Sequence, residues 1–171
     1  MQIKKYDSAL DLFLQLEKQL PTDYDVLIKI GHLYRRENKN SPQGHERLAE
    51  GYYRRAEALL ETQEALLSRE ELAFAFFELK KYNEAIIHFE KIKVTNPRSY
   101  FPPLMLGHSY RLLEKYQASA RNYRQALKLN QGLDEALFNL GLVNRAMDLR
   151  SASLNAFEKM SWVSKELQDK S

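Results

Sequence analysis

Histidines are the residues best suited to catalysis or metal binding in this sequence, and there are four: His32, His45, His88 and His108. None has the His-Glu-x-x-His spacing of a zinc site, and no serine or cysteine elbow motif accompanies them. The chain has no cysteine and no glycine-rich phosphate loop. The sequence therefore predicts no enzyme, no metal site and no cofactor. We interpret His32 and His108 either as polar side chains that line a binding groove, described below, or as solvated side chains.

Three arginines follow a glycine at the same distance and indicate a different chemistry. Arg35, Arg111 and Arg145 each stand four residues after a glycine. A guanidinium donates its hydrogen bonds in a fork that suits carboxylates and phosphates. Arginines in register on one rim therefore indicate recognition of acidic groups, although they also fit a solvated face paired with Glu78 or Glu114.

The charge balance limits the classes of partner. The chain of 171 residues carries 26 basic and 23 acidic residues, which are interspersed and leave a formal net charge of +3. Without a one-signed stripe, this balance only weakly favours nucleic-acid binding. The sequence also lacks an apolar run near 18 residues and a signal peptide, so we predict no membrane insertion and a cytoplasmic location.

Self-similarity at a fixed period is the strongest structural signal. The small residues Ala73, Gly107 and Gly141 are 34 residues apart, and Gly31 begins an earlier unit. An aromatic follows three residues later in the first three units, as Tyr34, Phe76 and Tyr110, whereas the last unit has Asn144. Twelve residues after the small residue comes another, with an aromatic four residues on: Ala85 with Phe89, Ser119 with Tyr123 and Ser153 with Phe157. These spacings predict two amphipathic helices per unit that approach closely at the small residue.

The pattern resembles the tetratricopeptide repeat, a helix–turn–helix unit, over nearly the whole chain. The resemblance implies an all-α fold, a right-handed superhelical α-solenoid of stacked antiparallel helix pairs with about nine helices. One ligand class of this family, a chaperone tail held in a two-carboxylate clamp, is not expected. The places of that clamp hold Ile28, His32, Glu71, Phe101 and Met105, none of which matches its Lys, Asn and Arg pattern.

The repeats divide a single array into one half unit and four full units. We assign residues 1–22 to the half repeat, 24–65 to a long first repeat with a loop insertion at 38–46, then 66–99, 100–133 and 134–167, with the last helix extending toward the C-terminus. Pro102 and Pro103 predict a helix that starts near Pro102, because proline is tolerated only in the first turn. The unpaired half unit leads us to expect a piece of a longer array, or self-association through Leu10, Phe13 and Leu16.

In such solenoids the first helices of the units line a concave groove. Positions one and four after the small residue, and three and six before it, form one helical stripe. The stripe has an apolar middle and an arginine rim. The predicted peptide-binding residues are His32, Arg35, Phe74, Phe77, Phe101, Leu104, His108, Arg111, Phe138, Leu142 and Arg145.

The groove predicts a protein-interaction scaffold or adaptor that binds a peptide with apolar anchors and an acidic flank, within a larger protein or assembly. An alternative is a small secretion-type chaperone that shields an apolar client segment. RNA binding is a third interpretation, which the apolar groove argues against. The expected partners are a protein or peptide and a second copy of the chain.

Overall fold

The fold, seen in a computed structural model, consists of α-helices and the turns between them. The structure describes residues 3–36, 42–60 and 66–168, with side chains within 8–36, 44–60 and 69–160. Over these ranges the chain forms nine helices and no strand, as predicted for an all-α solenoid of adjacent helix pairs. The helices are α1 (Ile3–Gln19), α2 (Tyr24–Arg36), α3 (Pro42–Leu60), α4 (Leu66–Glu78), α5 (Tyr82–Thr95), α6 (Phe101–Leu112), α7 (Tyr116–Leu129), α8 (Asp134–Ala146) and α9 (Arg150–Gln168).

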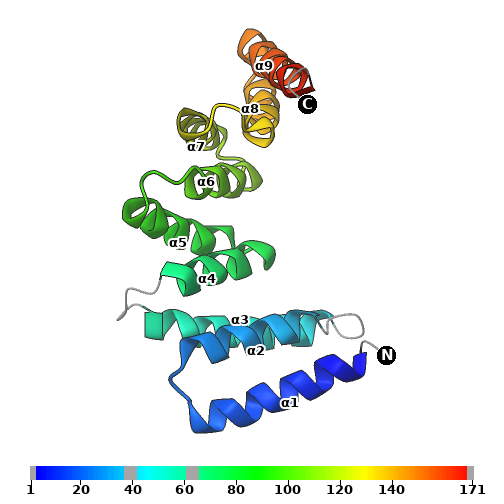
Figure 1. Cartoon of the computed structure of the whole chain (residues 1–171), viewed down its shortest axis with the longest axis vertical. Coiled ribbons are helices and arrows are strands. Elements are labelled where there is room, and N and C mark those ends of the chain that lie inside the picture. The colour runs from blue at the N-terminus through cyan, green and yellow to red at the C-terminus, as the bar shows by residue number, and fades with distance from the viewer. Residues whose placement is uncertain (1–2, 37–41, 61–65, 169–171) are drawn as a thin grey trace. The chain divides into compact units, whose positions relative to one another are not determined.

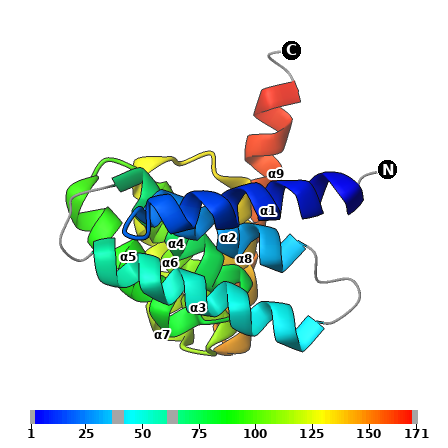
Figure 2. The same ribbon diagram turned by 90° about the horizontal axis from the view of Figure 1, so that it is seen from below.

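The chain divides within α5 into two compact units, residues 1–88 and 89–171. In unit 1, α2 packs against both α1 and α3, and the three helices run side by side (Figures 1 and 2). In unit 2, α6 pairs with α7 and α8 pairs with α9, while α7 also packs against α8. Each unit therefore buries its apolar faces between neighbouring helices.

In three repeats, a glycine of the first helix packs directly under an aromatic ring of the second helix. A Cβ atom at Gly107 would lie 2.6 Å from two ring carbons of Tyr123, and one at Gly141 would lie 2.5 Å from the ring of Phe157. Gly31 meets Tyr53 in the same way. The close approach predicted from the small residues is therefore confirmed, because no larger side chain fits beneath these rings.

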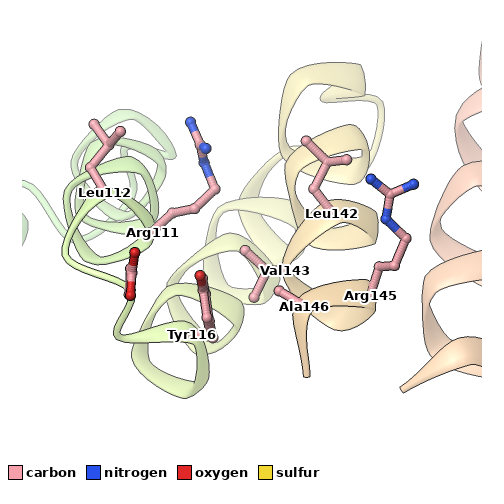
Figure 3. Close-up of a pocket in the computed structure, with 8 residues that line it drawn as sticks. Arg111, Leu112, Tyr116, Leu142, Val143, Arg145 and Ala146 are labelled. Atoms are coloured by element: carbon pink, nitrogen blue, oxygen red, sulfur yellow. The ribbon is translucent and has the colours of Figure 1, made fainter. Parts of the chain in front are cut away.

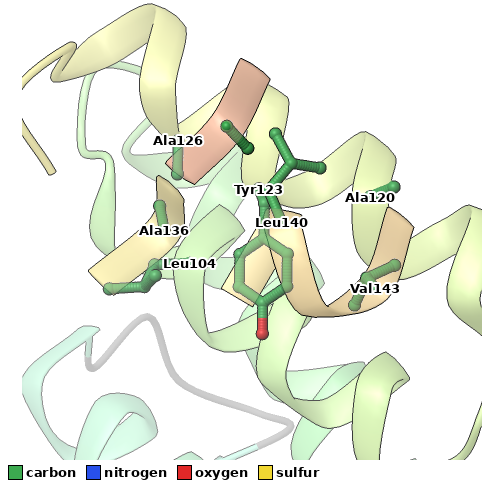
Figure 4. Close-up of a cluster of buried hydrophobic side chains, with 8 residues drawn as sticks. Leu104, Ala120, Tyr123, Ala126, Ala136, Leu140 and Val143 are labelled. Atoms are coloured by element: carbon green, nitrogen blue, oxygen red, sulfur yellow. The ribbon is translucent and has the colours of Figure 1, made fainter. Parts of the chain in front are cut away.

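Hydroxyl groups reinforce the same helix pairs in unit 2. Ser119 Oγ donates to the carbonyl oxygen of Gly107 and Ser153 Oγ to that of Gly141, each at 2.8 Å. The ring of Tyr123 stands at the centre of the core, among Leu104, Leu140 and Val143 (Figure 4). This core fixes the position of α6 against α8, the two helices that carry the predicted binding residues of unit 2.

The tight turns between paired helices follow one pattern. Lys80, Glu114 and Asp148 each adopt a left-handed conformation, with φ of 60°, 57° and 57°. The amide of the next residue then donates to a carbonyl oxygen five residues earlier, as from Lys115 to Tyr110. This Schellman arrangement satisfies the last carbonyl groups of the first helix and reverses the chain.

The predicted loop at 38–46 is wrong for residues 42–46, which form the first turn of α3. Residues 38–41 lie outside the described ranges. Proline is favoured in a first helical turn, because its φ is preset and its missing N–H would be unpaired there anyway. The extra residues thus lengthen α3 to 19 residues, against 14 in α7. The predicted helix start near Pro102 is confirmed, since α6 begins at Phe101.

Candidate functional site

Three of the predicted binding residues line one pocket in unit 2. Arg111 comes from α6 and Leu142 and Arg145 come from α8, around a cavity of about 570 Å³ (Figure 3). Leu112, Val143 and Ala146 add apolar surface, Glu114 comes from the turn after α6, and Tyr116 is the first residue of α7. The pocket therefore combines two guanidinium groups and one carboxylate with an apolar wall.

The two arginines of the pocket have no carboxylate partner among the described residues, whereas their counterpart in unit 1 does. Arg35 Nη2 lies 2.5 Å from the carboxylate of Glu78, which stands five residues after the small residue Ala73 of the next repeat. The same position after Gly141 is occupied by Ala146. Because alanine cannot neutralise a guanidinium, no carboxylate of the described residues neutralises Arg111 at the pocket wall.

A network centred on the buried ring of His108 lies near Arg111. Tyr123 OH lies 3.0 Å from His108 Nδ1, and Glu135 Oε1 lies 3.2 Å from His108 Nε2. Burial lowers the pKa of His108, as does the nearby charge of Arg111, while Glu135 opposes the shift. A neutral histidine that donates from Nε2 to the carboxylate must accept at Nδ1, so the Tyr123 hydroxyl donates there. Burial also raises the pKa of Tyr123 to about 12, which keeps that hydroxyl protonated.

Unit 1 repeats part of this network around His32. Tyr53 OH lies 3.1 Å from His32 Nδ1, and the two rings meet edge to face. Burial lowers the pKa of His32, and Arg35 lowers it further. His32 and Arg35 line a smaller cavity of about 350 Å³ together with Phe13 and Lys29. Neither His32 nor His108 is a simply solvated side chain, because each is hydrogen-bonded to a buried tyrosine.

The predicted apolar groove residues differ in how much surface they expose. In unit 2, Leu104 is 5% exposed and belongs to the core, whereas Phe138 is 45% exposed on α8. Phe101 is half-buried with its ring edge against Phe89. A ligand surface in unit 2 can use Phe138 and Leu142 but not Leu104, which the next repeat covers.

In unit 1, Phe74 and Phe77 are both half-buried. The ring of Phe77 meets that of Tyr82 edge to face, with 5.5 Å between the ring centres. Phe76, which the repeat pattern places in the contact between the helices, is fully buried. The residues proposed for self-association, Leu10, Phe13 and Leu16, are also half-buried, on the helix that packs against α2. These side chains thus contribute to the packing of unit 1.

The sequence did not single out Ala146, Tyr123 and Glu135 as parts of this site. Ala146 could have been found by comparing repeats in register, because it stands where Glu78 stands in the second repeat. The hydrogen bonds of His108 had no such signal, because Glu135 comes from a different helix. Nor did the sequence predict the burial of His88, whose Nε2 lies 3.1 Å from Glu57 Oε1.

Neither a metal site nor a membrane span is found among the residues that the structure describes. No group of His, Asp and Glu side chains there could hold a metal ion. No helix in the same ranges is long and apolar enough to span a membrane.

Comparison with known proteins identifies the repeat and the fold. Residues 107–148 match a family model described as a TPR repeat, where TPR stands for tetratricopeptide repeat. A crystal structure of MamA superposes with a TM-score of 0.77 at 18% identity, covering 98% of this chain and 94% of that one. MamA from Desulfovibrio magneticus RS-1, from residue 41 to its end, gives a TM-score of 0.76 at 16% identity, over 94% and 86% of the two chains.

No curated protein sequence matches the chain. At these identities the structural matches show a shared fold, a solenoid of packed helix pairs. The family model assigns residues 107–148 to a tetratricopeptide repeat, and the glycine–aromatic pair of that segment, Gly107 with Tyr123, recurs at Gly31 with Tyr53 and at Gly141 with Phe157.

Proposed function

We propose that the chain is a protein-interaction scaffold whose unit 2 binds a peptide carrying a carboxylate and an apolar side chain. One observation supports this most directly: Arg111 lacks the carboxylate that neutralises Arg35 at the equivalent place. A ligand carboxylate would take the position that Glu78 takes in unit 1. Charge-assisted hydrogen bonds of this kind are about twice as strong as neutral ones.

The pocket offers contacts for the rest of such a peptide. Arg145 supplies a second guanidinium, so a peptide with two acidic groups would be favoured over one with a single group. Leu142 lines the cavity, and Phe138 stands one helical turn before it with 45% of its surface exposed. An aliphatic or aromatic anchor of the peptide would cover both side chains. We expect affinities on the order of micromolar, typical of peptides bound in helical grooves.

A chaperone that shields an apolar client is less well supported. Such a surface would need a continuous apolar floor, whereas Leu104 is buried and the pocket wall carries two arginines and Glu114. The charged groups favour a ligand that is acidic as well as apolar.

The test is a selection of binders from a displayed library of random peptides against the whole chain, followed by titration calorimetry of a selected peptide. We expect acidic peptides with an apolar residue. Their binding should be lost in the double variant Arg111→Glu/Arg145→Glu and retained in Arg121→Glu/Arg150→Glu. The control pair changes the net charge equally, but neither of its residues lines the pocket. Equal affinity for both double variants would refute the proposal.

A further inference from the structure

Unit 2 contains a second cavity of about 670 Å³ that shares no residue with the first. It lies between α7 and α9, and α8 contributes Leu137, Leu140 and Asn144 to its lining. At 100° per residue, Leu140 and Asn144 point roughly 150° away from Leu142 and Arg145 around α8. The two cavities therefore open on opposite sides of the same helix.

The second cavity lies where the last repeat departs from the others. Three residues after the small residue, the first three repeats carry the aromatic rings of Tyr34, Phe76 and Tyr110, and the last carries Asn144. An asparagine fills less volume than an aromatic ring, so space remains between the helices. Asn144 is only 2% exposed, and its side-chain oxygen is buried without a hydrogen-bond partner in the described part of the chain.

A buried acceptor without a donor costs free energy. Asn144 lines the cavity, and no described residue donates a hydrogen bond to its oxygen. A donor brought by a ligand would satisfy it. Asn144 therefore provides an acceptor at the cavity wall that a ligand could use.

The charges around the opening are of one sign. Arg124, Lys128 and Lys159 are exposed at its edge, and none of them forms an ion pair with another described residue. No described carboxylate lines the cavity, whereas Glu114 lines the first one. The floor is apolar, since Leu137 is 4% exposed and Leu140 is 8% exposed. A ligand that matches this surface is acidic at its ends and aliphatic at its centre.

We propose that this cavity docks a second acidic protein segment, which inserts a small aliphatic side chain over Leu137 and Leu140 and donates an N–H or O–H group to Asn144. Single-stranded nucleic acid would match the positive charge, but it binds through stacking on aromatic side chains. Among the residues whose side chains the structure describes, no aromatic lines this cavity. The inference does not depend on the proposed function, because the two cavities share no residue.

The experiment uses the whole chain carrying Arg111→Glu/Arg145→Glu, in which the first pocket is disabled. A displayed library of random peptides is selected against this variant, and a selected peptide is titrated by calorimetry. We expect acidic peptides whose binding falls at least tenfold with either Asn144→Tyr or Lys128→Glu/Lys159→Glu. The matched control, Arg121→Glu/Arg150→Glu, changes the net charge equally outside the cavity and should retain binding.

Asn144→Tyr restores the residue type of the other repeats, so it should raise or maintain the melting temperature while it fills the cavity. If that variant unfolds, the charge-reversal variant at two exposed lysines still tests the site. Selection of no acidic peptide, binding that neither variant weakens, or displacement of the peptide by single-stranded polyuridylate would each overturn the proposal. The selected peptides are also titrated against variants made in the wild-type background. If only substitutions of Arg111 and Arg145 abolish binding there, the result would support the first pocket and contradict the second.

Discussion

The substitution Ala146→Glu tests the missing-carboxylate argument most directly, because it introduces into unit 2 the ion pair that unit 1 already has. A glutamate at this position should reach Arg111 as Glu78 reaches Arg35 at 2.5 Å. The Arg35–Glu78 pair is partly exposed, with 27% of the arginine side chain and 43% of the glutamate side chain accessible. Its contribution to stability should be about 0.2–1 kcal/mol. Ala146 is the last residue of α8, and a negative charge at a helix C-terminus is repelled by the helix dipole, which lowers the free energy of unfolding by a similar amount. We therefore expect the melting temperature to change little.

Binding should respond more strongly than stability. A hydrogen bond between charged groups contributes about 1.5–3 kcal/mol, and tenfold in affinity corresponds to about 1.4 kcal/mol. Calorimetry with a peptide selected on the wild-type chain should therefore show Kd rising by roughly ten- to a hundredfold. Ala146→Gln is the control of matched size without the charge. Unchanged affinity in the glutamate variant, or an equal loss in both variants, would refute the reasoning.

Two further predictions concern the packing and the histidines. Gly107→Ala should destabilise the chain by about 1–3 kcal/mol in urea denaturation, because its Cβ would meet the Tyr123 ring. Gly51→Ala should stabilise the chain by up to about 1 kcal/mol, because a Cβ at Gly51 would have nothing within 4 Å. The opposite order of stabilities would contradict the close-packing argument. Because the pKa of His108 is lowered in the folded state, the unfolded state binds a proton first as the pH falls below about 6.5. The free energy of unfolding should therefore decrease between pH 6.5 and the folded-state pKa of His108, by up to about 1.4 kcal/mol per pH unit. His108→Gln should weaken this dependence between pH 7.5 and 5.5, and an unchanged profile would show that His108 does not titrate on unfolding.

The repeat pattern predicted the helices and their contacts because it encodes steric requirements that act within one helix pair. The spacing predicted a close approach of the two helices at the small residue, and the structure shows it with Gly107 beneath the ring of Tyr123. The register of Arg111 and Arg145 likewise brought both to one pocket, since equivalent positions of stacked first helices face the same way.

The helical stripe predicted poorly which side chains a neighbouring helix covers. Leu104 lies on the same stripe as His108 and Arg111, yet it is buried against Ala136 and Leu140 of the next repeat. An angular position on an isolated helix does not say how far the next helix extends over it. The state of His108 was also beyond the sequence, because it depends on a hydroxyl from α7 and a carboxylate from α8.

Both proposed sites arise where one repeat loses a side chain that another repeat keeps. Ala146 replaces the carboxylate of Glu78, which leaves a positive charge unpaired, and Asn144 replaces an aromatic ring, which leaves a cavity and an unpaired acceptor. The position of Ala146 varies among the four repeats, whereas the position of Asn144 is aromatic in the other three. At both positions the last repeat lacks a group that satisfies a neighbour elsewhere in the chain, and a partner could supply that group. The two departures lie two residues apart on α8 and face different cavities, so the last repeat is where we expect the ligand contacts of this protein to concentrate.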